Sequence, residues 1–244
     1  MLHSKPYQTF KNKMLHFDDD IEFSDILYSN IKASVLPQGA QQLFKFQNNN
    51  KHPTISRYKI CQDNRLMVVR HLKSTISASY IKDAYEEVTL YLRSIVMEAY
   101  QNATVEPERI IGEHKVNMSA VDILNGISDG TLAQKVIDSM FQSLENERST
   151  LSLIKKICKK LGISVSDGLI DNAVYYLEIR HKLVHTDGYA DEDFQKTHTT
   201  LKYTGGGYID LTYSTLVSAK KALFDLVNAI DEDAINKNII NPHT

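Results

Sequence analysis

The sequence predicts a mainly α-helical protein, in which a helical bundle carries short β-hairpin additions. Apolar residues recur at three- and four-residue spacing over most of the second half of the chain, which is the period of an amphipathic helix. Stretches rich in β-branched and aromatic residues are few and short, so sheet is a minor component. No internal repeat is visible. The helical segments are expected near 76–99, 121–127, 132–147, 151–161, 166–185 and 214–230.

Composition places the chain among ordinary globular proteins. It has 244 residues, 42% of them hydrophobic and 24% charged, and a net charge of −2, so any nucleic-acid contact must come from a local patch. Cys61 and Cys158 lie far apart in apolar surroundings, which predicts reduced core thiols. No apolar run reaches membrane-spanning length, and the N-terminal residues M-L-H-S-K-P-Y-Q show no signal-peptide core. We therefore expect a cytoplasmic protein that does not enter a membrane.

Three regions are predicted along the chain. Residues 1–75 form an N-terminal extension, which begins as a loosely attached polar arm and continues with a short helix capped by Ser24. The extension ends in a β-hairpin made by the runs 54–61 and 65–72. Residues 76–232 form the helical domain, and residues 233–244 form a polar tail that frays.

The helical domain is predicted element by element from its period and its breaks. A long helix begins near Ile76, and a loop with Pro107 follows it. Gly162 ends the helix of residues 151–161, and Ser166 or Asp167 begins the next one. Two short runs flank the glycine-rich stretch 204–207 and predict a hairpin, after which Ser214 caps the last helix.

The end of the helix before Thr186 carries an arginine and two histidines close together. Arg180, His181 and His185 crowd its last turns, and Thr186-Asp187-Gly188 then stops it. The two histidines are four residues apart, so they lie on one face, whereas Arg180 and His185 are about 140° apart around a helix of 3.6 residues per turn. A histidine can transfer a proton near neutral pH, and a guanidinium can hold a phosphate. RNA supplies its own nucleophile, the 2′-hydroxyl, so this set suits metal-independent RNA cleavage.

The run R-H-K-L-V-H, residues 180–185, resembles the Arg-X4-His motif of the HEPN superfamily. The order of helices and the stretch H-T-D-G-Y-A-D-E-D-F resemble RiboL-PSP-type and related single-domain HEPN ribonucleases over residues 76–232. The resemblance implies that Arg180 and His185 are the catalytic pair and that His181 occupies the polar position beside the arginine. Where HEPN toxins controlled by a nucleotidyltransferase antitoxin have a tyrosine, two residues after the histidine, this chain has Asp187.

The resemblance also implies an activity and partners. Active members are homodimeric, metal-independent endoribonucleases of toxin–antitoxin, abortive-infection and other antiviral-defence systems. We therefore expect an endoribonuclease that leaves 2′,3′-cyclic phosphate and 5′-hydroxyl ends, with RNA as substrate, a second copy of the chain as partner, and an antitoxin as a further candidate partner. No cofactor and no metal ion is expected. The alternative is a catalytically silent HEPN-like module that binds RNA, a nucleotide or a partner; a plain dimerisation domain is a third possibility.

Simpler interpretations of the same residues stay open at this stage. Cations near a helix C-terminus favour the helix dipole, so Arg180 and His185 could serve only as caps. His181 and His185 could instead bind a metal ion with Asp187 or Asp191. The lysines at 155, 156, 159 and 160 could guide RNA or form a solvated helix face. Tyrosines 175, 176 and 189 could stack on bases or pack in the core.

Overall fold

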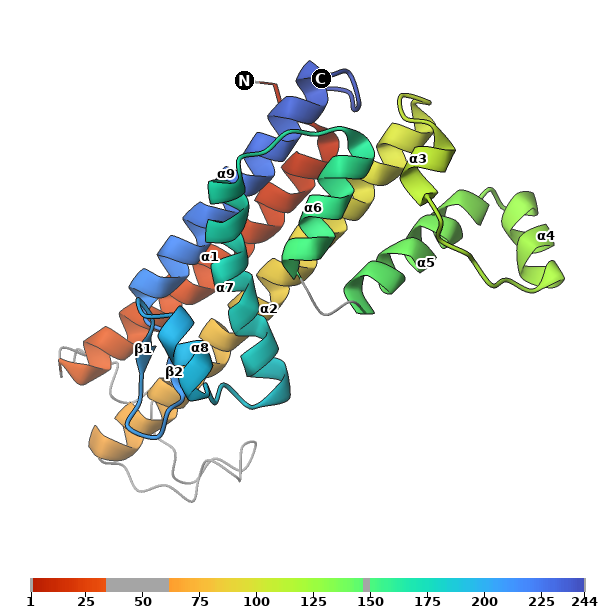
Figure 1. The fold of residues 1–244 in the computed structure, drawn as a ribbon. Helices are drawn as coiled ribbons and strands as arrows, with labels where there is room; N and C mark the ends of the chain where they lie inside the picture. Colours follow the sequence, from red (N-terminus) through yellow and green to blue (C-terminus); the bar gives the residue numbers. More distant parts are fainter. Residues whose placement is uncertain (1, 34–61, 147–149, 244) are drawn as a thin grey trace.

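Long helices dominate the computed structural model of the chain, which describes residues 2–33, 62–146 and 150–243 (Figure 1). Four of them run side by side as the main bundle, namely α1 (Lys5–Lys32), α2 (Gln62–Gln101), α7 (Asp167–His185) and α9 (Tyr213–Asn236). The shorter helices α3 (Pro107–Ile111), α4 (Ala120–Ser128) and α5 (Leu132–Asn146) extend to one side. The prediction of a mainly helical protein with a short antiparallel hairpin is confirmed.

The prediction for the start of the chain is wrong. Residues 5–32 form one long helix rather than a loose arm followed by a short helix. Ser4 begins it, because its side chain accepts a hydrogen bond from the Tyr7 backbone N–H at 3.2 Å. Ser24 is buried inside the helix and donates to the Ile21 carbonyl at 3.0 Å. Tyr7, Phe10, Met14 and Ile21 fall on one face of α1 and join the core of the bundle.

The prediction of a hairpin before the helical domain is also wrong for its second strand, residues 65–72. Residues 65–72 belong to α2, which begins at Gln62, so the predicted turn at residues 62–64 is the start of that helix. The run 54–61 lies outside the described residues. The long helix expected from Ile76 is therefore confirmed in type, but it starts earlier than predicted.

A buried carboxylate connects the two ends of the chain. Asp231 on α9 is fully buried and accepts hydrogen bonds from the Ser4 backbone N–H at 3.0 Å, from the Ser4 hydroxyl and from the Tyr91 hydroxyl at 3.3 Å. Buried charges are stable only when they are satisfied in this way. α9 continues past Asp231 to Asn236, and Ile239 and Ile240 are buried, so the prediction of a frayed polar tail is wrong.

The later elements follow the prediction closely. The short helix expected at residues 121–127 is α4, and the helix expected at 132–147 is α5, which ends at Asn146. α6 (Thr150–Leu161) and α7 match the predicted segments, and Ser166 caps α7 by accepting from the Leu169 N–H at 3.4 Å. Thr212 rather than Ser214 caps α9. The loop with Pro107 contains α3.

The small sheet lies beside α8 (Glu192–Thr197) at the lower end of the bundle in Figure 1. β1 (Lys202–Tyr203) pairs antiparallel with β2 (Ile209–Asp210), with Lys202 opposite Asp210. Gly207 adopts a φ of 79° in the turn between them, a conformation that glycine reaches without strain. The predicted hairpin around residues 204–207 is confirmed.

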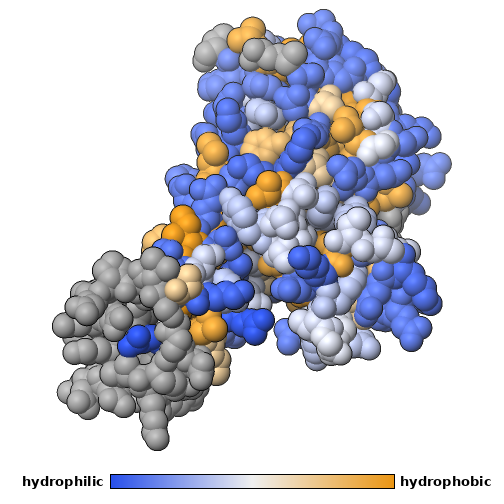
Figure 2. Space-filling view, turned by 90° about the vertical axis from the view of Figure 1, so that its left-hand side faces the viewer, coloured by the Kyte–Doolittle hydropathy of each residue, from blue (hydrophilic) through white to orange (hydrophobic). Residues whose placement is uncertain are grey.

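On the face that Figure 2 shows, hydrophobic residues form separate patches among hydrophilic ones rather than a continuous band. Within the described ranges, no helix is both long and apolar enough to cross a membrane.

Candidate functional site

The three residues that the sequence singled out line one cavity. Arg180, His181 and His185 border a space of about 610 Å³ at the C-terminal half of α7. Three further residues of α7 line it, namely Leu177, Glu178 and Lys182. Three other helices supply the rest of the lining, namely Tyr85 of α2, Thr150 and Leu153 of α6, and Phe194 of α8. A single chain therefore brings the predicted pair and its neighbouring histidine to a common space, with one apolar wall.

The two histidines lie close together on the exposed side of this cavity. The ring centroids of His181 and His185 are 4.5 Å apart, and the planes are inclined by 44°. Both side chains are exposed, as the spacing of four residues on one helix face predicts. Two neighbouring imidazoles can accept and donate protons to the same small reactant.

Arg180 has a different environment from the histidines. Its side chain is half-buried, and its guanidinium carbon lies 4.6 Å from the centre of the Tyr85 ring. A guanidinium over an aromatic face is stabilised by the ring quadrupole. Its N–H groups project from the edges of the guanidinium plane, so they stay available to an anion in the cavity. Tyr85 could not be recognised as a site residue from the sequence, because it is one of many apolar positions on α2.

The turn after His185 is fixed by its own hydrogen bonds. The Thr186 hydroxyl is 2.9 Å from the Lys182 carbonyl oxygen and 2.7 Å from the Tyr189 carbonyl oxygen. The Gly188 N–H donates to the Lys182 carbonyl at 2.9 Å, with a φ of 83° at Gly188. The helix therefore stops where the sequence predicted, and the last histidine is held by a closed turn.

The small sheet holds this turn from the other side. The Ile209 N–H donates to the Gly188 carbonyl at 2.9 Å, and the Ala190 N–H donates to the Gly207 carbonyl at 3.0 Å. The rings of Tyr189 and Tyr208 meet edge to face with centroids 5.7 Å apart. The hairpin of residues 202–210 thus acts as a brace for the end of α7.

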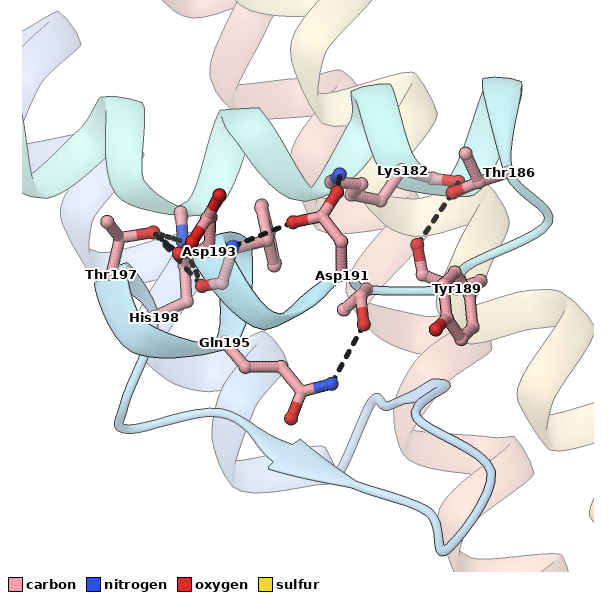
Figure 3. Close-up of polar contacts among 10 residues, drawn as sticks. Lys182, Thr186, Tyr189, Asp191, Asp193, Gln195, Thr197 and His198 are labelled. Carbon is pink, nitrogen blue, oxygen red and sulfur yellow. Dashed lines mark hydrogen bonds and ion pairs between the residues drawn. The ribbon is translucent and has the colours of Figure 1, made fainter.

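Lys182 of α7 and Asp191, at the start of α8, form an ion pair beside the site (Figure 3). The Lys182 ammonium pairs with the Asp191 carboxylate, and the same carboxylate accepts from the Phe194 N–H at 2.9 Å as the cap of α8. The bond from Lys182, followed by that from Phe194, holds the pKa of Asp191 below its usual value. The carboxylate of Asp191 therefore pairs with Lys182 and caps α8. Among the described residues it does not form a metal-binding group with the two histidines.

His198, to which the sequence gave no role, is a packing residue. It is 3% exposed and stacks on the Phe194 ring at 3.8 Å and on the Tyr175 ring at 4.5 Å. Its Nε2 lies 3.1 Å from the Tyr175 carbonyl oxygen. These contacts hold α8, and with it Phe194, against α7.

The other residues weighed in the sequence analysis lie elsewhere. Tyr175 and Tyr176 are half-buried and meet edge to face at 5.1 Å, so they act as packing residues, whereas Tyr189 is exposed. His114 Nε2 lies 3.2 Å from the Ser139 hydroxyl. In the part of the chain that the structure describes, no group of three or more His, Cys, Asp or Glu side chains could hold a metal ion.

A larger cavity, of about 880 Å³, lies between α1, α2 and α5. Its lining includes Arg93 and Asp138, which form an ion pair at 3.5 Å, and apolar side chains such as Leu90 and Met97. It contains none of the predicted site residues. Volume alone favours this cavity, but the α7 cavity combines a guanidinium with two imidazoles, a set that suits chemistry on a phosphate.

The chain matches no protein-family model, no curated protein and no solved structure.

Proposed function

We propose that the chain is a metal-independent endoribonuclease whose active site is the α7 cavity. One observation supports this proposal most strongly: Arg180, His181 and His185 line a single cavity, with the two imidazoles side by side. This arrangement can bind a phosphodiester and supply a proton acceptor and a proton donor to it.

The reaction uses the 2′-hydroxyl of RNA as nucleophile. A neutral imidazole takes the 2′-hydroxyl proton while the oxygen forms a bond to phosphorus. The bond from phosphorus to the 5′-oxygen breaks, and a protonated imidazole gives its proton to that leaving oxygen. The products are a 2′,3′-cyclic phosphate and a 5′-hydroxyl end. We assign these two roles to His185 and His181, which are close enough to act on one phosphate.

Arg180 stabilises the charge that develops on the phosphate. Its N–H groups offer a rigid fork to the non-bridging oxygens, and a pre-positioned donor of this kind lowers the barrier more than a mobile one. The contact with Tyr85 supports this role, because it restricts the position of the guanidinium before the substrate arrives.

The proposal extends to the family and to the working assembly. The place of the Arg-X4-His motif at the end of a late helix in a helical body supports membership of the HEPN superfamily. By that resemblance, the active form is a homodimer, a toxin or an antiviral-defence effector, and an antitoxin is a candidate regulator. Because each chain already gathers the three residues, a second copy would present a second set to the same RNA. Light scattering on the purified chain gives its mass in solution and tests the dimer directly.

Cleavage of total RNA in the presence of EDTA tests the activity. Wild type is expected to cut, and both Arg180→Ala and His185→Ala are expected to lose cutting while keeping the thermal midpoint of wild type. The alternative of a silent binding module predicts RNA binding without cleavage in wild type. Cutting that persists in both variants removes these residues from the mechanism.

A further inference from the structure

The α7 cavity carries one carboxylate among its basic groups. Of the described residues that line it, Glu178 is the only acidic one, whereas Arg180, Lys182 and the two histidines are basic. A carboxylate repels a phosphate, so the part of the cavity at Glu178 does not suit the backbone of RNA. A base is neutral and carries N–H donors, so it is the part of a nucleotide that this carboxylate can bind.

The position of Glu178 relative to the histidines suits one nucleotide. Glu178 is three residues before His181 and seven before His185, so the three side chains lie on one face of α7. At a rise of 1.5 Å per residue, Glu178 is about 4.5 Å from His181 and about 10.5 Å from His185 along the helix axis. A nucleotide whose phosphate lies at the histidines can therefore place its base at Glu178.

A buried histidine contacts the carboxylate. His198 Nε2 lies 3.4 Å from a Glu178 carboxylate oxygen and 3.1 Å from the Tyr175 carbonyl oxygen. An ionised carboxylate has about four acceptor positions, so this contact leaves most of them open. The Glu178 side chain is 52% exposed. Its carboxylate is therefore held by the fold on one side and accessible to a ligand on the other.

The cavity also has room and an apolar wall for a base. Leu153, Leu177 and Phe194 line it together with Glu178. Its volume of about 610 Å³ lies within the usual range of small-molecule sites. Unstacked bases of single-stranded RNA are commonly bound in this way, with the ring against apolar or aromatic side chains and the edge hydrogen-bonded.

Guanine is the base whose edge fits a carboxylate best. Its N1–H and N2–H donors lie side by side, so each can donate to one carboxylate oxygen. On the edges of adenine, cytosine and uracil an acceptor lies beside the donor, and that acceptor repels a carboxylate. We infer that Glu178 forms a guanine-binding subsite next to the phosphate that is cut. The inference rests on the proposed ribonuclease function, and it names the preferred substrate, single-stranded RNA with guanine beside the scissile bond.

A binding experiment on the full chain tests the inference without cleavage. The probes are four fluorescein-labelled RNA pentamers, U-U-X-U-U with X as G, A, C or U, in which fluorine replaces every 2′-hydroxyl and so removes the nucleophile. Dissociation constants are measured by fluorescence anisotropy for wild type, Glu178→Gln and Glu192→Gln. Glu192→Gln is the matched control, because it removes the same charge from an exposed residue of α8 that does not line the cavity.

The expected result is a change in base preference. Wild type should bind the guanine probe about tenfold more tightly than the uracil probe, the effect of one bidentate base contact. Glu178→Gln should bring this ratio to about one and raise the adenine-to-uracil ratio, because an amide offers adenine one acceptor and one donor. Glu192→Gln should keep the wild-type ratios.

The outcomes separate this inference from the ribonuclease proposal. Equal wild-type affinities, no wild-type binding, or a guanine preference that survives Glu178→Gln overturns the inference. So does a shift of all four affinities by one factor in Glu178→Gln, which is the effect of charge alone. Wild-type cleavage of unmodified RNA without guanine preference leaves the ribonuclease standing, whereas guanine preference in binding without any cleavage overturns the ribonuclease and leaves the base contact of Glu178.

Discussion

The guanidinium carbon of Arg180 lies over the ring of Tyr85, 4.6 Å from the ring centroid. The two residues come from different helices, α7 and α2, and are 95 positions apart in the chain. This contact connects the catalytic proposal to the packing of the bundle, because α2 helps to set where the Arg180 guanidinium lies.

Removing the ring at position 85 should slow cleavage without unfolding the protein. In Tyr85→Leu the guanidinium loses a contact that is worth about 1 kcal/mol, so the single-turnover rate is expected to fall about fivefold. Tyr85→Phe keeps the ring and should stay within about twofold of wild type. Equal rates for Tyr85→Leu and wild type, at equal thermal midpoints, would show that the ring does not position Arg180.

A substitution at Gly188 should lower both the free energy of unfolding and the rate of RNA cleavage. Alanine at this φ of 83° costs about 1–2 kcal/mol and disturbs the closed turn behind His185. Gly188→Ala is therefore expected to lower both the free energy of unfolding and the cleavage rate. Gly168→Ala, near the start of the same helix, is the control, because an added Cβ there meets nothing within 4 Å. That variant should be neutral or slightly more stable, and urea unfolding measures both.

The buried carboxylate of Asp231 should be the more important of two acidic residues on α9. Asp231→Ala leaves the Ser4 and Tyr91 donors without their acceptor, which is expected to cost about 3 kcal/mol. Asp225→Ala breaks an exposed pair with Lys221 and should cost less than about 1 kcal/mol. Comparable urea midpoints for the two variants would contradict the role given to Asp231.

The thiol of Cys158 should be inert in the folded protein. Burial, with a smaller contribution from Asp233, raises the pKa of this thiol from 9.0 to about 11. The raised pKa alone lowers the thiolate fraction at pH 8 about 100-fold. In a Cys61→Ser background, a disulfide reagent is expected to label Cys158 only after denaturation. Rapid labelling of the native protein would show that the thiol is exposed.

The same pKa shift predicts a pH dependence of stability. Below pH 9 the thiol is protonated in both the folded and the unfolded chain, so it contributes no pH dependence. Between pH 9 and about 11 the unfolded chain loses the proton and the folded chain keeps it. The free energy of unfolding should therefore fall as pH rises through this window, by up to about 1.4 kcal/mol per unit from this group. The Cys158→Ala variant should show a shallower slope in urea titrations at pH 8 and pH 10.5.

Much of the helical domain could be predicted from the sequence because its signals are local. Ser166 caps α7, and Thr186-Asp187-Gly188 ends it, and both are visible as residue types at set positions. The glycine-rich hairpin is equally local. Arg180, His181 and His185 could be chosen as candidate site residues from the last turns of one helix, without knowledge of the packing.

The first helix was missed for a physical reason. Tyr7, Phe10, Met14 and Ile21 recur at helical spacing, but the charged run 18–20 between them suggested a solvated arm. Asp18 is in fact buried, where it pairs with Lys220 of α9, 202 positions away. A pairing between residues so far apart in the chain produces no pattern in the sequence near either residue. The helical run 65–72 was missed because its two valines and two leucines fit either a helical or a strand period over so short a stretch.

The lining of the site was missed for the same kind of reason. Tyr85, Leu153 and Phe194 reach the cavity from three different helices, so only the packing of the bundle brings them to Arg180. The pairing of Lys182 with Asp191 depends on the turn between α7 and α8. Residue type identifies the chemistry here, while tertiary contacts identify the pocket in which it takes place.

The most direct test of the proposed chemistry compares three substrates of one sequence in the presence of EDTA. They are an RNA, the same RNA with 2′-O-methyl groups, and the corresponding DNA, each incubated with wild type and with His185→Ala. We predict that wild type cuts only the unmodified RNA and leaves 2′,3′-cyclic phosphate and 5′-hydroxyl ends, whereas His185→Ala cuts none of the three. Cleavage of the DNA or of the 2′-O-methyl RNA by wild type, or undiminished cleavage of RNA by His185→Ala, would contradict the account.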